Sequence, residues 1–208
     1  MRSFGYRLPK CSARSFHKKG RDQLPSELAE TLGPIVETIG LLTEKIKDYD
    51  RRIEELTAER YPETRLLRQV SGVGALTALT FVLTLENPQR FVKSRLVGAY
   101  LGLVPGTDHS GEQEDPQKRI SGEGEEMLRR LLVGSAAHYI LGPFAPDSDL
   151  RRHGEKIAQR GGKNAKKRAV VAVARKLCVL LHRLWVSGEV YEPLRNARRL
   201  GVQGEEVA

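Results

Sequence analysis

The sequence contains little cysteine, few aromatic residues and no long apolar run. Its 208 residues include two cysteines, Cys11 and Cys178, and neither has the Cys or His partner spacing of a zinc site. A disulfide framework and a secreted fold are therefore not supported, and a reducing cytosol fits better. The longest apolar stretch, 74–85, falls well short of the roughly 20 residues that span a bilayer. We expect a soluble, cytoplasmic protein.

Alternation of apolar and polar residues with a period of two is also missing, whereas apolar residues recur at helical spacing. The predicted fold class is mainly α, with an N-terminal coiled-coil helix followed by a compact helical domain that has a helix-hairpin-helix-like element. The predicted organisation is a basic disordered leader over 1–28, a coiled-coil helix over 29–61, a helical domain over 62–190 and a tail over 191–208.

The leader is rich in Lys, Arg and Ser and has no acid up to Lys19. This composition resembles an organelle transit peptide. The alternative is a plain disordered leader, and one version of it is a translation start inside a longer, interrupted gene. The motifs described below favour that version.

A heptad seam predicts the coiled-coil helix. Its apolar residues alternate spacings of four and three, and charged residues fill the other faces; the seam consists of Ile35, Ile39, Leu42, Ile46, Tyr49, Ile53 and Leu56. Pro62 ends this helix near Tyr61. The seam either drives self-association or packs on the same chain as one arm of a helical hairpin, and we favour self-association.

The helical domain shows helical patterns separated by loops. The predicted helices cover 64–70, 75–85, 91–101, 127–142 and 164–186. A polar loop lasts from Gly102 to Gly124, which is long for a compact domain and therefore suggests a function. A basic loop is expected from Arg151. The last helix is predicted to be amphipathic, with Val170, Val173, Ala174, Leu177, Leu181 and Leu184 on one face and Arg168, Arg175, Lys176, His182 and Arg183 on the other.

The charge balance favours a polyanionic partner. Lys and Arg number 35 against 26 acids, which gives a net charge of +9. The whole excess lies in 151–199, where 14 basic residues face three acids, a balance of +11. Cations that neutralise phosphates strengthen nucleic-acid binding by releasing counterions. The candidates are Lys163, Lys166, Lys167, Arg168, Arg175 and Lys176, and a solvated charged face is the alternative.

A glycine-rich turn, Ser71-Gly72-Val73-Gly74, separates two predicted helices. It resembles the hairpin of helix-hairpin-helix DNA binders, in which backbone N–H groups approach a phosphate. The alternative is a tight connection between packed helices. Gly72 and Gly74 are accordingly candidate DNA-binding residues, as are Arg119 and Arg129 at the end of the polar loop.

The polar loop contains Thr107-Asp108-His109-Ser110-Gly111, which places a hydroxyl beside a His, an Asp and a flexible Gly. Such a hydroxyl suits a nucleophile that reaches a phosphodiester, although a turn or cap role is the ordinary explanation for a loop serine. Six acids surround the loop: Glu112, Glu114, Asp115, Glu123, Glu125 and Glu126. They lack a recognised metal-ligand pattern, and the last three fit the first turn of the next helix. No metal site is predicted.

Four motifs in order carry a resemblance to a known family. They are VSGVGALTALTFV, RFVKSRLVGAYLGLVPGTDHSG, KRISGEGEEMLRRLL and KKRAVVAVARKL. Together they resemble the C-terminal domain of insertion sequence one-ten type transposases, from about Glu63 to Trp185. The resemblance implies that Ser110 attacks DNA and forms a phosphoserine link. It also implies a RuvC-like nuclease domain with acidic magnesium ligands, and a bridge RNA as guide in some members.

This sequence departs from the family in two respects. We expect the RuvC-like domain to be missing from the chain, so that magnesium binds only in that missing domain and the chain itself has no cofactor. The family pattern also usually has a lysine after Ile-Ser where this sequence has Gly122, and the resemblance therefore implies that a phosphate contact is missing here.

The leading functional hypothesis is the C-terminal part of a transposase or recombinase that binds DNA and supplies Ser110 for strand exchange, and that is inactive alone. Its partners would be DNA, a guide RNA in some cases, and further copies or full-length subunits bound through the coiled coil. In a bacterial cytosol it would be nucleoid-associated when bound to DNA. The alternatives are a non-catalytic helix-hairpin-helix-type DNA-binding module and a coiled-coil regulator.

Overall fold

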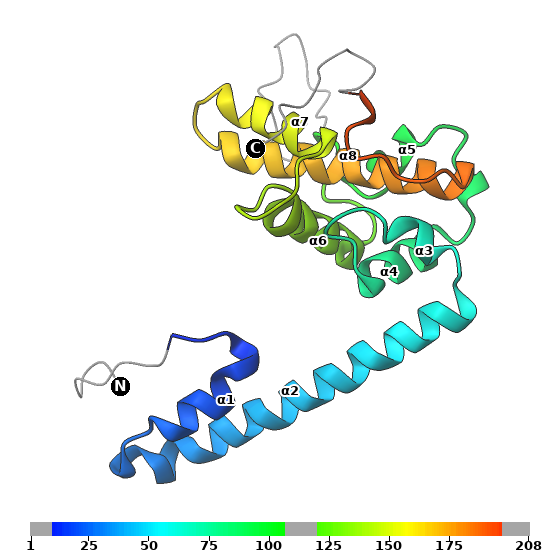
Figure 1. The fold of residues 1–208 in the computed structure, drawn as a ribbon. Helices are drawn as coiled ribbons and strands as arrows, with labels where there is room; N and C mark the ends of the chain where they lie inside the picture. The colour runs from blue at the N-terminus through cyan, green and yellow to red at the C-terminus, as the bar shows by residue number, and fades with distance from the viewer. Residues whose placement is uncertain (1–9, 107–119, 197–208) are drawn as a thin grey trace, which may run out of the picture. The chain divides into compact units, whose positions relative to one another are not determined.

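The computed structural model describes residues 10–106 and 120–196, and their secondary structure is helical (Figure 1). Within these ranges no strand forms, and one antiparallel bridge joins Pro105 to Ile120. The mainly α prediction is confirmed. In chain order the elements are α1 (Ala13–Asp22), α2 (Ser26–Arg60), α3 (Thr64–Leu67), α4 (Ala75–Leu85), the 3-10 turn η2 (Pro88–Arg90), α5 (Arg95–Tyr100), α6 (Glu126–Gly134), the π-helical η3 (Ser135–Ile140), α7 (Asp149–Gln159) and α8 (Ala165–Ser187).

The chain divides into two compact units, residues 1–56 and 57–208. In the first unit α1 lies along α2. Arg14 of α1 forms a salt bridge of 2.9 Å with Asp50, and the ring of His17 lies against Gly40. Helix α1 occupies part of the stretch 1–28 that the sequence assigned to a disordered leader.

The heptad seam lies on a different face of α2 from Gly40, and most of it faces solvent in the single chain. Ile35, Leu42, Ile46 and Tyr49 are each more than half exposed, at 57%, 57%, 54% and 61%. Helix α1 therefore does not cover the seam. The alternative in which the seam packs within a helical hairpin of the same chain finds no support in the described residues.

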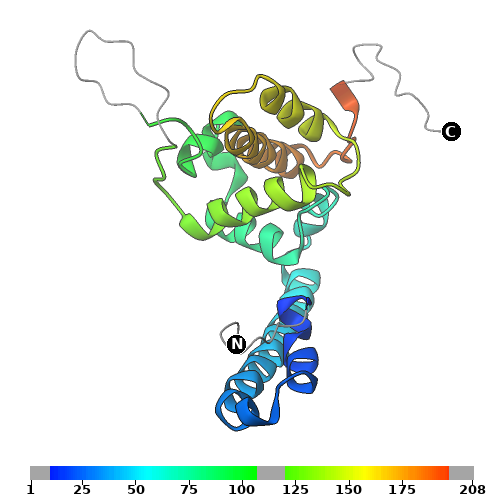
Figure 2. The same ribbon diagram turned by 90° about the vertical axis from the view of Figure 1, so that its left-hand side faces the viewer.

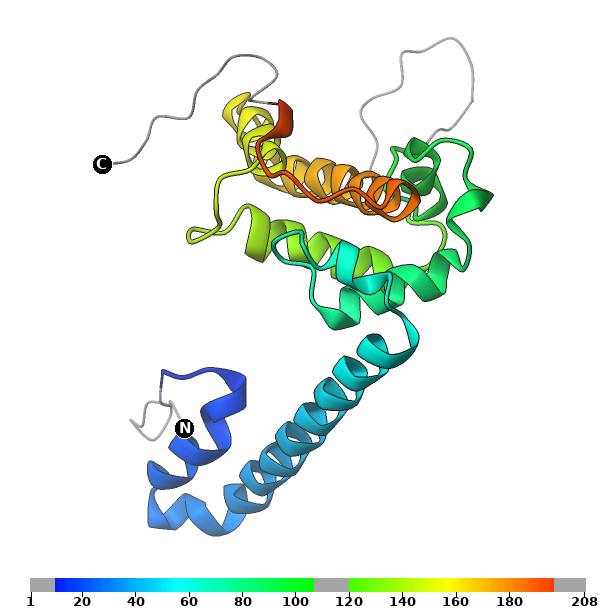
Figure 3. The same ribbon diagram turned by 45° about the vertical axis from the view of Figure 1, so that its right-hand side comes forward.

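The second unit is built around α8. This helix packs against α7, α6, η3, α5 and α3, and α7 runs beside it (Figures 1 and 2). Figure 3 shows α4 and α6 below α8, and the segment that follows α8 runs back along this helix. The core consists of large side chains that are almost fully buried, among them Leu67, Phe81, Leu85, Leu101, Leu128, Leu132, Leu177 and Leu181. Burial of this apolar surface is the main stabilising term.

Most helix predictions for this unit are close to the observed elements. The prediction of 75–85 coincides with α4, and that of 164–186 differs from α8 by one residue at each end. The stretch 91–101 is helical over Arg95–Tyr100 alone. The basic loop expected from Arg151 is wrong, because this stretch forms α7. Ser148 caps that helix by accepting a hydrogen bond of 3.1 Å from the Arg151 backbone N–H.

The predicted faces of α8 need one correction. Val173, Ala174, Leu177, Leu181 and Leu184 are buried as expected, but His182, assigned to the polar face, is 1% exposed. Its two ring nitrogens bond to partners on the chain before α5, which satisfies the polar edge of a buried imidazole.

In the described part of the chain, no helix combines the length and the apolarity that a bilayer crossing requires.

Candidate nucleic-acid interface

The polar loop has a structured base, which we call the loop stem and define as residues 100–106 and 120–124. The two segments run side by side. Besides the bridge from Pro105 to Ile120, the Ser121 N–H donates to the Val104 carbonyl at 2.9 Å. The Gly122 N–H donates to the Gly102 carbonyl at 3.2 Å. The stem therefore fixes where the residues between 106 and 120 leave and rejoin the helical core.

Two glycines allow the stem segments to approach this closely. Gly102 has a φ of +63°, and a Cβ there would overlap the backbone of Glu123. Gly124 has a φ of +80°, and a Cβ there would overlap the Tyr100 carbonyl oxygen. A residue with a side chain is disfavoured at both positions, because the positive φ is strained for it and because its Cβ would overlap the opposite stem segment. Gly102 and Gly124 thus have a structural reason that spacing alone did not reveal.

Arg129 of α6 ties the two stem segments together. Its guanidinium donates to the Glu123 carbonyl at 2.9 Å and to the Leu101 carbonyl at 3.3 Å. The same helix is capped by Glu125, whose carboxylate accepts from the Leu128 N–H at 2.5 Å, and Glu126 lies in its first turn. Glu125 and Glu126 therefore act at the helix start, as predicted. Arg129 remains a candidate DNA contact, and it holds the stem in addition.

Ser110 and Arg119, the predicted nucleophile and a predicted DNA contact, lie outside the described residues. Three of the six loop acids, Glu112, Glu114 and Asp115, also lie outside the described residues, and Glu123 lies two residues before the N-cap of α6 rather than in its first turn. In the described ranges no group of three or more His, Cys, Asp or Glu side chains is placed to hold a metal ion. The absence of a metal site from the whole chain stays a prediction.

The two glycines of the turn before α4 differ in their surroundings. Gly72 has a φ of +86°, and a Cβ there would lie 2.6 Å from the Cβ of Tyr139 in η3. This close contact fits the tight-connection alternative. Gly74 is the N-cap of α4, and a Cβ there would meet nothing within 4 Å. The approach to the first N–H groups of α4 is thus open at Gly74.

A group of cations surrounds the turn from α7 to α8, and we call Lys163, Lys166, Lys167 and Arg168 the turn cluster. All four are exposed, and the first turn of α8 has no acid. Arg168 donates to the Gly161 carbonyl at 3.0 Å. Among the described residues, no carboxylate lies within 4.0 Å of the charged atoms of these four residues. Positive charge at a helix N-terminus is unfavourable, and a bound anion would offset it.

Arg175 and Lys176 lie farther along α8 and have different neighbours. The aliphatic part of Arg175 packs beside Gly98 of α5, where an added Cβ would lie 3.1 Å from the Arg175 Cγ. Lys176 lies near His153 of α7 and, after burial, contributes to holding the pKa of His153 below its ordinary value. Arg175 thus lies beside α5 and Lys176 lies near α7, and neither belongs to the turn cluster.

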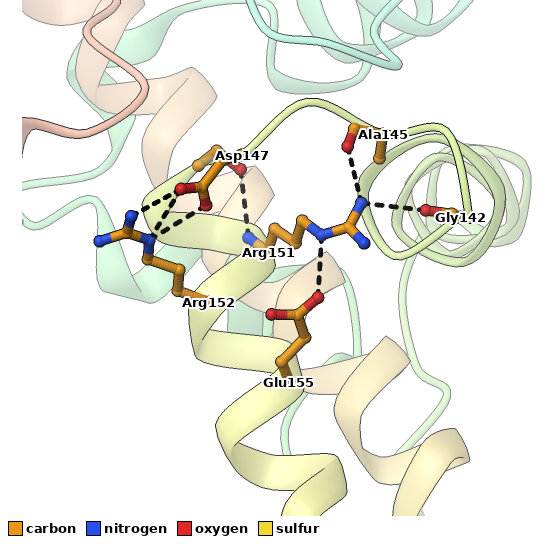
Figure 4. A network of polar contacts seen from close by, with 7 residues as sticks. Gly142, Ala145, Asp147, Arg151, Arg152 and Glu155 are labelled. Carbon is orange, nitrogen blue, oxygen red and sulfur yellow. Dashed lines mark hydrogen bonds and ion pairs between the residues drawn. The ribbon is translucent and has the colours of Figure 1, made fainter. Parts of the chain in front are cut away.

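Other arginines of the basic third are bonded within the chain (Figure 4). Arg151 donates to Glu155 at 2.8 Å and to the carbonyls of Gly142 and Ala145 at 3.0 Å and 2.7 Å. Arg152 pairs with Asp147 at 2.6 Å, and this hydrogen bond lowers the pKa of Asp147. Arg183 and Arg195 both pair with Glu189. A count of charges therefore overstates how many cations face a partner.

The sequence analysis did not select the cations of 90–95, which the structure leaves exposed. Arg90, Lys93 and Arg95 have no carboxylate of the described residues within 4.0 Å. A usable signal was present, because the twenty residues 87–106 contain these three cations and no acid. The larger excess of cations after Arg151 obscured this signal.

Comparison with known proteins identifies the family. Residues 64–143 match the Transposase IS116/IS110/IS902 family. The transposase for insertion sequence element IS1111A of Coxiella burnetii is 31% identical over 149 residues, which are 71% of this chain and 39% of the relative. The transposase for insertion sequence element IS1328 of Yersinia enterocolitica is 32% identical over 118 residues, which are 57% and 35%.

A third relative extends the similarity further along the chain. A probable family 20 transposase of Pseudomonas aeruginosa is 28% identical over 171 residues, which are 82% of this chain and 49% of the relative. The chain spans less than half the length of each of these three relatives. The family match covers α3 to η3 and includes both segments of the loop stem. This chain therefore carries, in its helical second unit, the C-terminal domain of the IS116/IS110/IS902 transposase family.

Proposed function

We propose that this chain is a DNA-binding part of a transposase and that it supplies Ser110 as the nucleophile of strand exchange. The observation that carries the proposal is the family match over 64–143, which includes Ser110. The loop stem supports it, because a helical core that anchors both ends of a loop restricts where a serine on that loop can reach. Restriction of this kind lowers the entropic cost of attack on a bound strand.

The proposed chemical step is a transesterification. The Ser110 oxygen forms a bond to a DNA phosphorus, the bond from that phosphorus to a strand oxygen breaks, and a proton passes from the serine to the released DNA hydroxyl. The phosphodiester count is conserved, so a second strand hydroxyl can reverse the step without an energy source.

DNA binding is proposed to use the turn cluster, Arg175, Lys176, Arg119, Arg129 and the backbone at Gly72 and Gly74. The exposed cations of the turn cluster, which have no carboxylate of the described residues within 4.0 Å, support this role most directly. Gly74 supports a helix-hairpin-helix-like contact, since the N-terminus of α4 is open there, whereas Gly72 packs against Tyr139. Contacts of these kinds read the phosphate backbone and carry little sequence information. In a bacterial cell such a protein would be associated with the nucleoid.

Strand transfer is proposed to require a full-length transposase subunit, which would contribute the magnesium-binding half of the site. The test mixes the tagged chain with such a subunit, a nicked duplex from an element end and Mg²⁺, with and without guide RNA. After denaturation, a covalent DNA adduct is expected at the mass of the tagged chain. Ser110→Ala should abolish it and Ser121→Ala, a matched stem serine, should retain it. An undiminished adduct in Ser110→Ala would reject the nucleophile.

The alternative is a non-catalytic nucleic-acid-binding module, which the exposed turn cluster favours by itself. Salt-sensitive binding without any adduct in the same experiment would support this alternative. If the chain neither forms the adduct nor binds DNA, the remaining alternative is a coiled-coil interaction protein.

Self-association through the heptad seam is proposed because its apolar side chains are exposed in the single chain, and burial of such a stripe is favourable. Sedimentation velocity should show an oligomer for the wild-type chain and a monomer for Leu42→Lys. Leu41, 70% exposed and off the seam, provides the matched control Leu41→Lys. An oligomer disrupted equally by both variants would contradict the seam as the contact.

A further inference from the structure

Arg90 is held in place by two aromatic rings. The Arg90 Cζ lies 5.6 Å from the centroid of the Phe91 ring and 5.3 Å from that of the Tyr100 ring. These rings contact one another edge to face, with centroids 5.3 Å apart. A guanidinium over an aromatic face is stabilised by the ring quadrupole, and its N–H donors remain free in its own plane. The rings thus order this side chain without using its donors.

The turn that carries Arg90 is fixed to α8 by the buried His182. Its Nε2 lies 2.8 Å from the Pro88 carbonyl oxygen, and its Nδ1 lies 3.0 Å from the Ser94 Oγ. The Pro88 contact requires a proton on Nε2, so Nδ1 accepts from the Ser94 hydroxyl. The His182 ring also contacts the Phe91 ring edge to face, at 5.7 Å. The backbone turn that carries Arg90 and the Phe91 ring that supports it therefore both contact the buried His182.

The surroundings of Arg90 are positive. Arg90, Lys93 and Arg95 are exposed, and no carboxylate in the described ranges lies within 4.0 Å of their charged atoms. Arg175 adds a cation beside Gly98 of α5. An ordered guanidinium without a carboxylate partner has donors to spare for an anion with paired oxygens, and a phosphodiester fits this description.

Arg90 is also adjacent to the loop stem. It lies over Tyr100, the first stem residue, whose carbonyl is in close contact with Gly124. A strand phosphate bound at Arg90 would consequently lie beside the base of the loop that carries Ser110.

We propose that Arg90, ordered by Phe91, Tyr100 and His182, is a preorganised contact for a DNA backbone phosphate next to the loop stem. The inference rests on the proposed DNA-binding function and adds a contact that neither charge clustering nor the sequence motifs indicated. Ordering in advance matters because a flexible side chain loses conformational entropy when it binds, whereas Arg90 is already restrained.

The test measures binding of the full 208-residue chain to a fluorescent duplex oligonucleotide across a range of KCl concentrations. Arg90→Ala should weaken binding about tenfold at about 0.1 M salt and reduce the salt slope by about one, as expected for one phosphate contact. Arg90→Lys and Tyr100→Leu should weaken DNA binding and leave the salt slope unchanged. Both variants keep the positive charge at position 90 but lose the contact that orders the guanidinium over the ring. Arg152→Ala, which removes a paired arginine elsewhere, is the charge-matched control and should bind like the wild type.

Each outcome decides the inference. Equal binding by the Arg90→Ala and Arg152→Ala variants would overturn it. Unchanged affinity in Arg90→Lys and in folded Tyr100→Leu would overturn preorganisation and leave a simple charge. No binding by the wild-type chain at low salt would instead reject the proposed DNA-binding function. Thermal unfolding of each variant establishes that the comparison is made between folded proteins.

Discussion

The cations near the two ends of α7 differ in whether they have partners within the chain. Around its N-terminus, Arg151 and Arg152 donate to Glu155, Asp147 and two backbone carbonyls (Figure 4). Beyond its C-terminus, the turn cluster has no carboxylate of the described chain within 4.0 Å. Both ends belong to the same basic third of the sequence. The first set stabilises the fold, and the second is free to meet an anion.

This difference shows why net charge alone does not locate an interface. A guanidinium that already has its hydrogen-bond partners gains little from a phosphate, since it would exchange one acceptor for another. The cations at the start of α8 are instead repelled by the helix dipole and by one another, and a polyanion relieves both effects. Three experiments test this difference between the two ends of α7.

The largest effect is expected at the free end. Replacing Lys163, Lys166 and Lys167 together by Gln removes about three phosphate contacts. Duplex affinity should then fall about a hundredfold at about 0.15 M salt, and the salt slope should fall by about three. Fluorescence anisotropy at several salt concentrations measures both quantities. A triple variant that binds like the wild type would show that the turn cluster is merely a solvated surface.

A smaller effect, on stability rather than binding, is expected at the bonded end. Arg151→Ala leaves the Ala145 carbonyl without its side-chain donor and the Gly142 carbonyl with only the Ala145 N–H, which should lower the free energy of unfolding by about 1–3 kcal/mol. Urea denaturation measures this loss. Arg152→Ala removes one exposed ion pair and should lower the free energy of unfolding less than Arg151→Ala does. The contrast fails if Arg151→Ala leaves stability intact but weakens DNA binding.

The smallest effect concerns His153, which lies in α7 between the two ends. Burial first, and then Lys176, Arg160 and Lys156, hold its pKa below the ordinary value. The unfolded chain therefore binds this proton more tightly, so stability should decline as the pH falls below the ordinary histidine pKa of about 6.5. His153→Gln should reduce that decline, and His138→Gln is the control at an exposed histidine. An NMR titration in Lys176→Gln should show a higher His153 pKa, and an unchanged one would contradict the electrostatic cause.

The long, strongly periodic helices were predictable from the sequence, and the short ones were not. Helices α4 and α8 follow apolar spacing closely, because burial of one face imposes a 3.6-residue period. Helix α7 was missed because its basic residues dominate the pattern, whereas its stability depends on the Ser148 cap and on packing against α8. Gly154 of α7 indicates how close that packing is, since a Cβ there would lie 2.7 Å from the Val173 Cγ2 of α8.

The candidate site divides in the same way. Residue types in order identified the transposase domain and selected Ser110 and the turn cluster, because those patterns are local in the chain. Arg129 holds the stem through Glu123 and Leu101, which lie 6 and 28 positions away in the sequence. Arg90 lies over the ring of Tyr100, which is 10 positions away. The fold brings these residues together. No periodicity records such contacts.

The helical class, the transposase family of the second unit and the sign of the net charge follow from the amino-acid sequence alone. Composition and spacing are sufficient for these properties, since each is a sum or a repeat along the chain. Only the tertiary structure decided which cations are free, where the stem closes and why His182 is buried. These properties depend on which side chains find a partner, and a hydrogen bond or an ion pair is settled by distance in space rather than by separation in sequence.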